Sequence, residues 1–214
     1  MPTRNDQVAG RLRAKAETAS RILDVAERLA QTRGFNGFSY ADVAAELHLT
    51  TAALHYHFAG KAALGRALIE RYAARFAEAL AVVDERERDA RAKLDAYARL
   101  YADVLREQRM CLCGMLAAEY RTLPKPMRDA VIRFFETNET WLAKVLEEGR
   151  SAGTLRFTGS ARKVAQAIVS GLEGAMLVAR PYEDPSRFRA AARLLIESLS
   201  VQGSSRSGRR LPHT

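Results

Sequence analysis

Residues 50–61 carry side chains whose types and spacing suit the recognition of DNA. A run of small residues is followed by aromatic and basic side chains. Small residues let a helix approach base edges, threonine offers a hydroxyl and a methyl group to the bases, and rings or ammonium groups can reach phosphates. The segment therefore predicts a helix that enters the major groove of double-stranded DNA. The expected DNA-contacting residues are Thr50, Thr51, Ala52, Ala53, His55, Tyr56, His57 and Lys61.

A second set of side chains, between residues 97 and 176, could line a pocket. Its centre is residues 110–124, which are mostly apolar, contain two cysteines and two methionines, and are interrupted by Gly114. Aromatic and thioether groups make adaptable walls for an apolar or aromatic small molecule. The same side chains could equally form the packed core of a helical domain. The candidate pocket residues are Tyr97, Tyr101, Val104, Cys111, Met115, Tyr120, Phe134, Phe135, Trp141 and Met176.

The other reactive residue types do not form a catalytic pattern. None of the four histidines is paired with a serine or cysteine in a recognisable nucleophile motif. The sequence has no phosphate-binding loop, no dinucleotide-binding glycine pattern and no metal-ligand spacing. We therefore expect no enzymatic activity, no cofactor and no metal. A helical small-molecule-binding protein without DNA function is the alternative from a different class.

The charge distribution favours a polyanionic partner. The chain has 214 residues and a formal net charge of +9, with +4 in residues 1–75 and +3 in residues 203–214. Excess positive charge favours DNA because each neutralised phosphate releases counterions. No apolar run is long enough to span a bilayer, and the first residues lack the apolar segment of a secretion signal. With only two cysteines, spaced awkwardly for a mutual disulfide, these features predict a cytoplasmic protein without a membrane partner.

Helical periodicity runs through nearly the whole chain and predicts an all-α fold. Ser39 and Thr50 are expected to cap two short helices, and Gly34 to end the first helix in a left-handed conformation. A long fourth helix is expected to join an N-terminal three-helix helix-turn-helix domain to a C-terminal helical ligand-binding and dimerisation domain. The expected boundaries are a flexible basic arm over 1–15, the DNA-binding domain over 16–64, the C-terminal domain over 65–202 and a disordered basic tail over 203–214.

Residues 34–64, GFNGFSYADVAAELHLTTAALHYHFAGKAAL, resemble the N-terminal domain of TetR-family transcriptional regulators. The matching positions are Val43, Ala44, Thr50, Leu54, His57, Phe58, Lys61 and Leu64, and the resemblance covers about residues 16–70. It implies a DNA-binding transcriptional repressor that releases a pseudo-palindromic operator when a small-molecule effector binds its C-terminal half. Two positions depart from the family pattern: His55 stands where a phosphate-binding tyrosine is common, and Ala52 where glycine is frequent.

The C-terminal region is expected to contain helices at about 89–107, 112–120, 125–151, 161–180 and 186–200. The last two are rich in small and apolar residues, and Gly171 and Gly174 would allow a close approach of helices. The family pattern implies that these two helices from each subunit form the four-helix interface of a homodimer. Glu173, amid apolar neighbours, is either paired across this interface or polar within the pocket.

Cys111 and Cys113 support a sharper alternative. Some TetR-family members sense electrophiles or oxidants through a cysteine in a comparable place, and a reactive thiolate needs a lowered pKa. Arg109 and Arg121 are near in sequence, and Cys111 lies close to an expected helix start. The alternative function is an electrophile- or redox-sensing repressor that acts through Cys111 or Cys113. Two inert, buried cysteines are the other interpretation.

Overall fold

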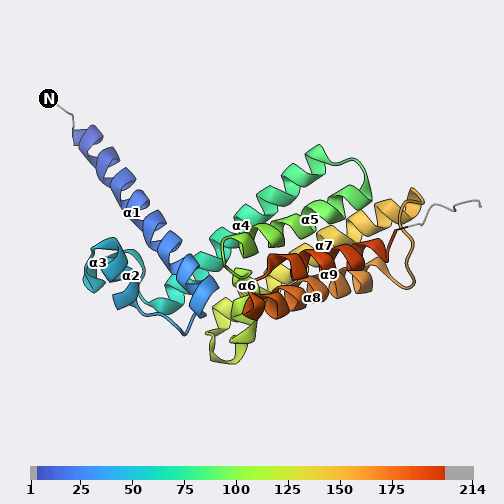
Figure 1. Ribbon diagram of the computed structural model, residues 1–214. Helices are drawn as coiled ribbons and strands as arrows, with labels where there is room; N and C mark the ends of the chain where they lie inside the picture. The colour runs from blue at the N-terminus through green and yellow to red at the C-terminus, as the bar shows by residue number, and fades with distance from the viewer. Residues whose placement is uncertain (1–3, 201–214) are drawn as a thin grey trace, which may run out of the picture.

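The computed structural model describes residues 4–200, and the helices follow one another with short connections over this range (Figure 1). The predicted all-α fold class is confirmed. The predicted basic tail at 203–214 lies outside the described residues. The elements are α1 Arg4–Arg33, α2 Tyr40–Leu47, α3 Thr51–His57, α4 Lys61–Arg86, α5 Ala90–Arg106, α6 Leu112–Ala118, η1 Tyr120–Thr122, α7 Lys125–Ser151, α8 Ala161–Ala179, η2 Arg180–Tyr182 and α9 Pro185–Glu197.

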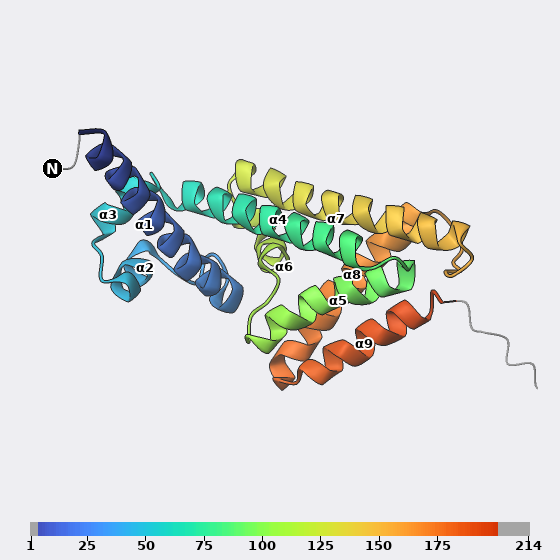
Figure 2. The same ribbon diagram turned by 90° about the horizontal axis from the view of Figure 1, so that it is seen from above.

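The helices form two regions. Helices α1, α2 and α3 gather at one end of the molecule, and α4 runs from them into a larger helical body (Figures 1 and 2). In that body α4 lies alongside α7, and α8 packs against both α7 and α9. The short helix α6 lies where the two regions meet, in contact with α1, α4 and α7. Helix α6 therefore contacts both regions, in addition to α4, which joins them along the chain.

Local signals explain the ends of the two short helices. Ser39 accepts a hydrogen bond from the backbone N–H of Asp42, and the Asp42 side chain accepts one from the Ser39 N–H at 2.7 Å, which completes a capping box. Thr50 caps α3 by accepting from the N–H of Ala53 at 3.1 Å. Gly34 ends α1 with φ of +87°, in the left-handed region that glycine adopts without strain. These three predictions are confirmed.

The first helix begins much earlier than predicted. The sequence predicted a flexible arm over residues 1–15 and a helix from about Ala16, whereas α1 is continuous from Arg4. Residues 4–15 contain Ala, Leu, Arg, Lys and Gln, which favour helix, and the single Gly10 costs only about 1 kcal/mol relative to alanine. The polarity of this segment does not indicate whether it forms a helix, because an exposed helix needs no apolar face.

The C-terminal helices agree closely with the expected ranges. The expected helix at 112–120 ends at Ala118 and passes into η1, and the helix expected at 161–180 passes into η2 at Arg180, one residue before Pro181. Buried apolar side chains from α4, α5, α6, α7, α8 and α9 form a continuous core that also reaches α1. No helix within residues 4–200 is long and apolar enough to cross a membrane.

Candidate nucleic-acid interface and effector core

Helix α3 presents its small residues outward. Leu54 is completely buried and fixes the inner face of the helix, while Thr51 and Ala52 are exposed and Ala53 is half-buried. The Thr50 hydroxyl is engaged at the N-terminus of the helix, as described above, although the residue itself is exposed. The outer face of α3 can therefore approach another molecule closely, as base reading requires.

Tyr56 extends this outer face. Its side chain is 70% exposed, and its ring meets that of His57 edge-on with a centroid separation of 5.3 Å. The Lys15 ammonium from α1 lies 4.5 Å from the centre of the Tyr56 ring. A cation over a tyrosine ring is attracted by the negative face of that ring. Tyr56 and Lys15 thus place a hydroxyl and a positive charge at one edge of the α3 surface.

His55 is held at the end of α3. Its Nδ1 lies 3.4 Å from the carbonyl oxygen of Ala59, and its ring is 4.7 Å from the ring of Tyr40. The Tyr40 hydroxyl in turn donates to the carbonyl of Phe58 at 3.0 Å, and burial raises the pKa of Tyr40 to about 12. These contacts brace α3 against α2. The exposed part of the His55 ring still faces outward.

Lys61 has contacts that sequence reasoning did not predict. Its ammonium donates to the carbonyl oxygen of Phe38 and lies over the rings of Phe35 and Phe38, at 4.8 and 4.6 Å from their centres. Partial burial lowers the pKa of Lys61. From sequence, Lys61 is expected to contact a phosphate because it is the first residue of a helix. In the structure its ammonium group instead contacts the turn that contains Phe35 and Phe38. In this conformation Lys61 stabilises the DNA-binding domain.

The expected pocket residues are gathered in the C-terminal core, with one exception. Tyr97, Tyr101, Cys111, Phe134 and Met176 are buried there, and Val104, Met115, Phe135 and Trp141 pack at its margin. Tyr120 lies in η1 with 38% of its surface exposed and the Arg128 guanidinium over its ring, because the chain leaves the core after α6. Tyr120 is therefore not part of the core that contains the other expected pocket residues.

A buried hydrogen-bond chain crosses this aromatic core. The Tyr97 hydroxyl donates to Oδ1 of Asn138 at 3.1 Å, so the Tyr101 hydroxyl donates to Tyr97 at 3.1 Å. The Asn138 amide group donates to the carbonyl of Phe134 at 2.8 Å. Trp141 stacks on Tyr97 with ring centres 5.7 Å apart and a 19° interplanar angle. Desolvation raises the pKa of both tyrosines, so they stay protonated donors.

Glu173 projects from α8 into the same region. A Cβ at Gly114 would overlap Oε2 of Glu173, so the carboxylate as placed packs directly against the glycine of α6 and would have to move for a larger residue. Burial raises the pKa of Glu173 to about 7, although a hydrogen bond with the Cys111 thiol partly opposes this. Its Oε1 is buried without a hydrogen-bond partner among the described atoms. Of the two interpretations from sequence, this geometry favours a polar group within the core.

The two cysteines are buried beside this carboxyl group. Cys111 and Cys113 are 1% and 0% exposed, and desolvation raises the pKa of both thiols, with a further contribution from the charge of Glu173. A thiol is nucleophilic as its thiolate, and burial in apolar surroundings opposes that form. This conformation therefore favours the interpretation of two inert, buried cysteines.

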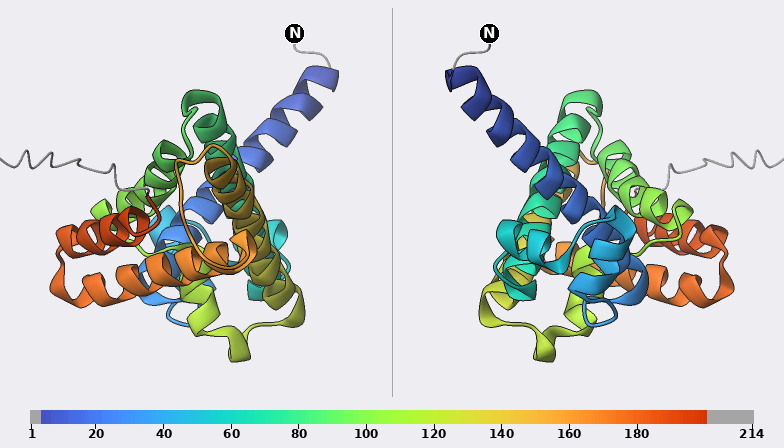
Figure 3. Two further views of the ribbon diagram at one scale, coloured as in Figure 1. Left: turned by 90° about the vertical axis from the view of Figure 1, so that its right-hand side faces the viewer. Right: turned by 90° about the vertical axis from the view of Figure 1, so that its left-hand side faces the viewer.

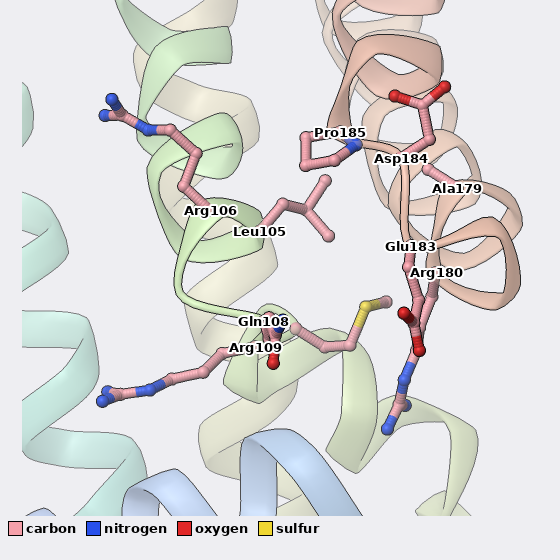
Figure 4. A pocket seen from close by; sticks show the side chains of 10 residues that line it. Leu105, Arg106, Gln108, Arg109, Ala179, Arg180, Glu183, Asp184 and Pro185 are labelled. Atoms are coloured by element: carbon pink, nitrogen blue, oxygen red, sulfur yellow. The ribbon is translucent and has the colours of Figure 1, made fainter.

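Several hollows lie on the surface of the described chain, and two of them bear on the predicted pocket. One of about 240 Å³ opens between α4 and α7, and its lining includes Phe76, Phe134 and Asn138. The other, of about 330 Å³, lies between the α5–α6 connection and η2 (Figure 4). Its arginine and acidic side chains give it a polar lining, and it contains none of the expected pocket residues. The hollow between α4 and α7 is lined by the expected pocket residue Phe134 and by Asn138 of the buried hydrogen-bond chain, so its wall is part of the predicted core.

Helix α6 and its neighbours are tied directly to the DNA-binding domain. The Glu119 carboxylate accepts hydrogen bonds from the backbone N–H groups of Phe35 at 2.9 Å and Asn36 at 3.1 Å. The Met110 N–H donates to the carbonyl of Gln31 at 3.2 Å. These bonds join both ends of the α6 region to the C-terminal end of α1 and the turn that follows. Sequence reasoning missed Glu119 because its partners lie more than 80 residues away.

Arg180 adds a contact from the other side. Its guanidinium donates to the carbonyl of Thr32 and to the sulfur of Met115, the latter at 3.4 Å. Figure 4 shows Arg180 extending from the end of α8 along the hollow. The end of α1 is therefore held by both α6 and η2. An independent shift of the C-terminal body and the DNA-binding domain at this point would break these hydrogen bonds.

The outer surfaces of α8 and α9 expose large apolar side chains. Leu177 and Val178 on α8 are 59% and 62% exposed, and Leu194 on α9 is 64% exposed. A Cβ at Gly174 would meet no atom within 4 Å, whereas one at Gly171 would approach Leu195 at 2.9 Å. Gly171 therefore serves the packing of α8 on α9, and Gly174 lies on the open face. The two helices run side by side along one edge of the body (Figures 1 and 3).

Two family models match the chain. Residues 22–68 match the model described as bacterial regulatory proteins of the tetR family, and residues 90–195 match the tetracyclin repressor-like C-terminal domain. The first range holds α2, α3 and most of the DNA-binding domain, and the second holds most of the C-terminal body. The two matched ranges follow the same division as the fold.

Individual relatives agree. A TetR-family regulator from Agrobacterium tumefaciens is 31% identical, with a TM-score of 0.85 over 87% of this chain and all of that chain. The Escherichia coli repressor NemR is 27% identical over 77% of this chain and 84% of its own, and the structure of its reduced form gives a TM-score of 0.75. The transcriptional regulator AcuR of Cereibacter sphaeroides is 28% identical over 69% of each chain.

Proposed function

The chain belongs to the TetR family of bacterial regulatory proteins, and from this we propose that it is a dimeric repressor that leaves its operator when a small molecule binds the C-terminal core. The observation that carries the proposal is the position of α6. This helix packs beside Glu173 at Gly114, and Glu119, directly after it, holds the turn before α2. One short element thus contacts both the core and the DNA-binding domain.

The proposed operator contacts come from α3. Thr51, Ala52 and Ala53 read base edges, and Tyr56 and His57 contact the backbone. The exposure of Thr51, Ala52 and Tyr56 supports this assignment, and Ala53 and His57 are half-buried beside them. Thr50 and His55 position the two ends of the helix. Lys61, which is engaged by Phe38, contributes through the stability of the domain. Two copies of α3 would lie about 34–36 Å apart to enter successive major grooves of a pseudo-palindromic site.

We propose that the second copy binds through α8 and α9. The exposed apolar side chains Leu177, Val178 and Leu194 support this interface, as does the open face at Gly174. Leu177→Glu should convert the dimer to monomer in sedimentation experiments, because it places a charge in an apolar contact. Val82→Glu is the matched control, since Val82 is also exposed but lies on α4. Equal behaviour of the two variants would reject this interface.

The proposed effector is an apolar or aromatic molecule that enters between α4 and α7. Aromatic walls and the polar group of Asn138 support this choice. Bound among Phe76, Phe134 and Tyr97, it would displace α6 and thereby move the turn held by Glu119. Release from DNA requires that the effector bind the displaced arrangement more tightly, because equal affinity for both arrangements shifts no population.

Fluorescence anisotropy tests the proposal. Labelled DNA from beside the protein's own gene is titrated at several salt concentrations, against a scrambled duplex of the same length. Preferential, salt-sensitive binding that is lost when an effector is added supports the repressor. Equal binding to both duplexes would favour the helical small-molecule-binding alternative. Electrophile sensing through Cys111 or Cys113 would require release of the operator that a double Cys→Ser variant abolishes.

A further inference from the structure

The N-terminal half of α1 projects from the DNA-binding end of the molecule. Every side chain from Asp6 to Glu17 is exposed, and the first fully buried residue of the helix is Ile22. Figures 1 and 3 show this half extending past α2 and α3, away from the larger helical body. We call residues 6–16 of α1 the arm. Its helix is not required for the core of the domain, so it calls for another explanation.

The charges of the arm are distributed unevenly around the helix. It carries three basic residues, Arg11, Arg13 and Lys15, against one acidic residue, Asp6. Arg11 and Lys15 are four residues apart and share one face, whereas Arg13 points in roughly the opposite direction, at about 200° from Arg11. One face of the arm therefore presents two cations in line with the helix axis.

That face is continuous with the outer surface of α3. Lys15 is the residue whose ammonium lies over the Tyr56 ring, and Tyr56 follows Ala52 by four residues on the exposed side of α3. Arg11 lies about 6 Å farther along α1, and the helix continues to Arg4, about 16 Å from Lys15. This length corresponds to roughly five base pairs of duplex DNA.

We propose that the arm is a second DNA-binding element, whose Arg11–Lys15 face binds the sugar–phosphate backbone just outside the bases that α3 reads. The inference rests on the proposed binding of an operator by α3. Charge complementarity identifies the occupant, since two aligned cations face the side from which DNA reaches Tyr56. A helix that carries these charges as a rigid extension orders few groups on binding, which limits the entropic cost.

The test compares two single-charge variants on two duplexes. Arg11→Gln removes a cation from the proposed face, and Arg13→Gln removes the same charge from the opposite face of the same arm. Each protein is titrated on the operator with its native flanks and on the operator trimmed at the outer edges of its half-sites. Glutamine favours helix, so circular dichroism should show an unchanged helix content in both variants.

The salt slope is the slope of the logarithm of the binding constant against the logarithm of the salt concentration. On flanked DNA we expect Arg11→Gln to lower the size of this slope by about 0.9 for each arm that loses one phosphate contact. The same loss should weaken binding about eightfold per arm at about 0.1 M salt. Arg13→Gln should bind as the wild type does. On trimmed DNA all three proteins should bind alike. This pattern would support a contact outside the half-site.

Several results would overturn the inference. Equal losses for the two variants would mean diffuse attraction by the net charge, and an equal loss on both duplexes would place Arg11 inside the half-site. The titrations also give the number of protein dimers bound to each duplex. If this number changes from one to two between the proteins or duplexes compared, the arm binds a second copy of the protein through the exposed Val8 and Leu12. If the wild type does not prefer native to scrambled DNA, the operator proposal fails with it, whereas retained preference without an effect of Arg11 rejects the arm alone.

Discussion

The buried carboxyl group of Glu173 should make the stability of the protein depend on pH. Its pKa is raised from 4.5 to about 7 in the folded chain by desolvation. A group whose pKa is raised on folding stabilises the fold at low pH, and this contribution is lost as the pH rises through the folded pKa. The group should therefore contribute most below about pH 4.5 and almost nothing above pH 7.

The size of the effect follows from the two pKa values. Between pH 5 and pH 8 the contribution of Glu173 to the free energy of unfolding should fall by about 2.5 kcal/mol per chain. Glu173→Gln removes the titration with little change in shape. The difference in unfolding free energy between wild type and variant should therefore change by this amount across the interval, whatever its absolute value at either end.

Urea unfolding, followed by circular dichroism at one protein concentration and at several pH values, measures this difference. A fixed concentration matters because dimerisation contributes to apparent stability. Glu78→Gln is the control, since Glu78 lies exposed on α4. A wild-type-to-variant difference that stays constant from pH 5 to pH 8 would refute the reasoning. Cys111→Ala should move the window to higher pH, because the thiol hydrogen bond holds the pKa of Glu173 down.

Two further variants test contacts between elements, and one labelling experiment tests the burial of the cysteines. Lys61→Met should lower the unfolding free energy by about 2 kcal/mol, because it leaves the Phe38 carbonyl without its charged donor. The salt slope of DNA binding should not change. A slope lower by about one would instead support the contact between Lys61 and a phosphate that the sequence predicts. Glu119→Ala should cost about 2 kcal/mol by the same measurement, because two backbone N–H groups lose their acceptor, while Glu136→Ala on the exposed side of α7 should be neutral. Cys111 and Cys113 should react with a disulfide reagent no faster than the protein unfolds, and rapid modification of the native protein would revive the electrophile sensor.

Local features of the chain were predictable because their causes are local. The caps at Ser39 and Thr50 depend on residues three positions away, and the left-handed end at Gly34 depends on the residue itself. Periodicity also located the C-terminal helices within a few residues, since each buries one apolar face. The fold class and the position of the helix-turn-helix follow from such signals without any knowledge of distant contacts.

The roles of individual polar side chains were less predictable. Lys61 and Glu119 each hold backbone groups of the segment between α1 and α2, and neither contact can be read from neighbouring residues. The beginning of α1 was misjudged for a different reason. An exposed helix has no apolar stripe to reveal it, so its polar composition resembled that of a flexible arm.

The short length of α6 suits the role that we propose for it, which is to carry a change in the core to the DNA-binding domain. The helix has seven residues, and it lies between the Glu173 carboxylate beside Gly114 and the turn that Glu119 holds. So short an element moves as a unit, since packed interiors transmit displacement rather than absorb it. The turn held by Glu119 is one of several contacts between the two regions, which include the Arg180 bond to Thr32 and the ion pairs of Arg71 with Asp24 and Glu27. In the proposed dimer, a tilt at α6 would change the separation of the two copies of α3. A pair of major grooves about 34–36 Å apart tolerates little change in that separation, so under the proposed function a small displacement of α6 would suffice to release the operator.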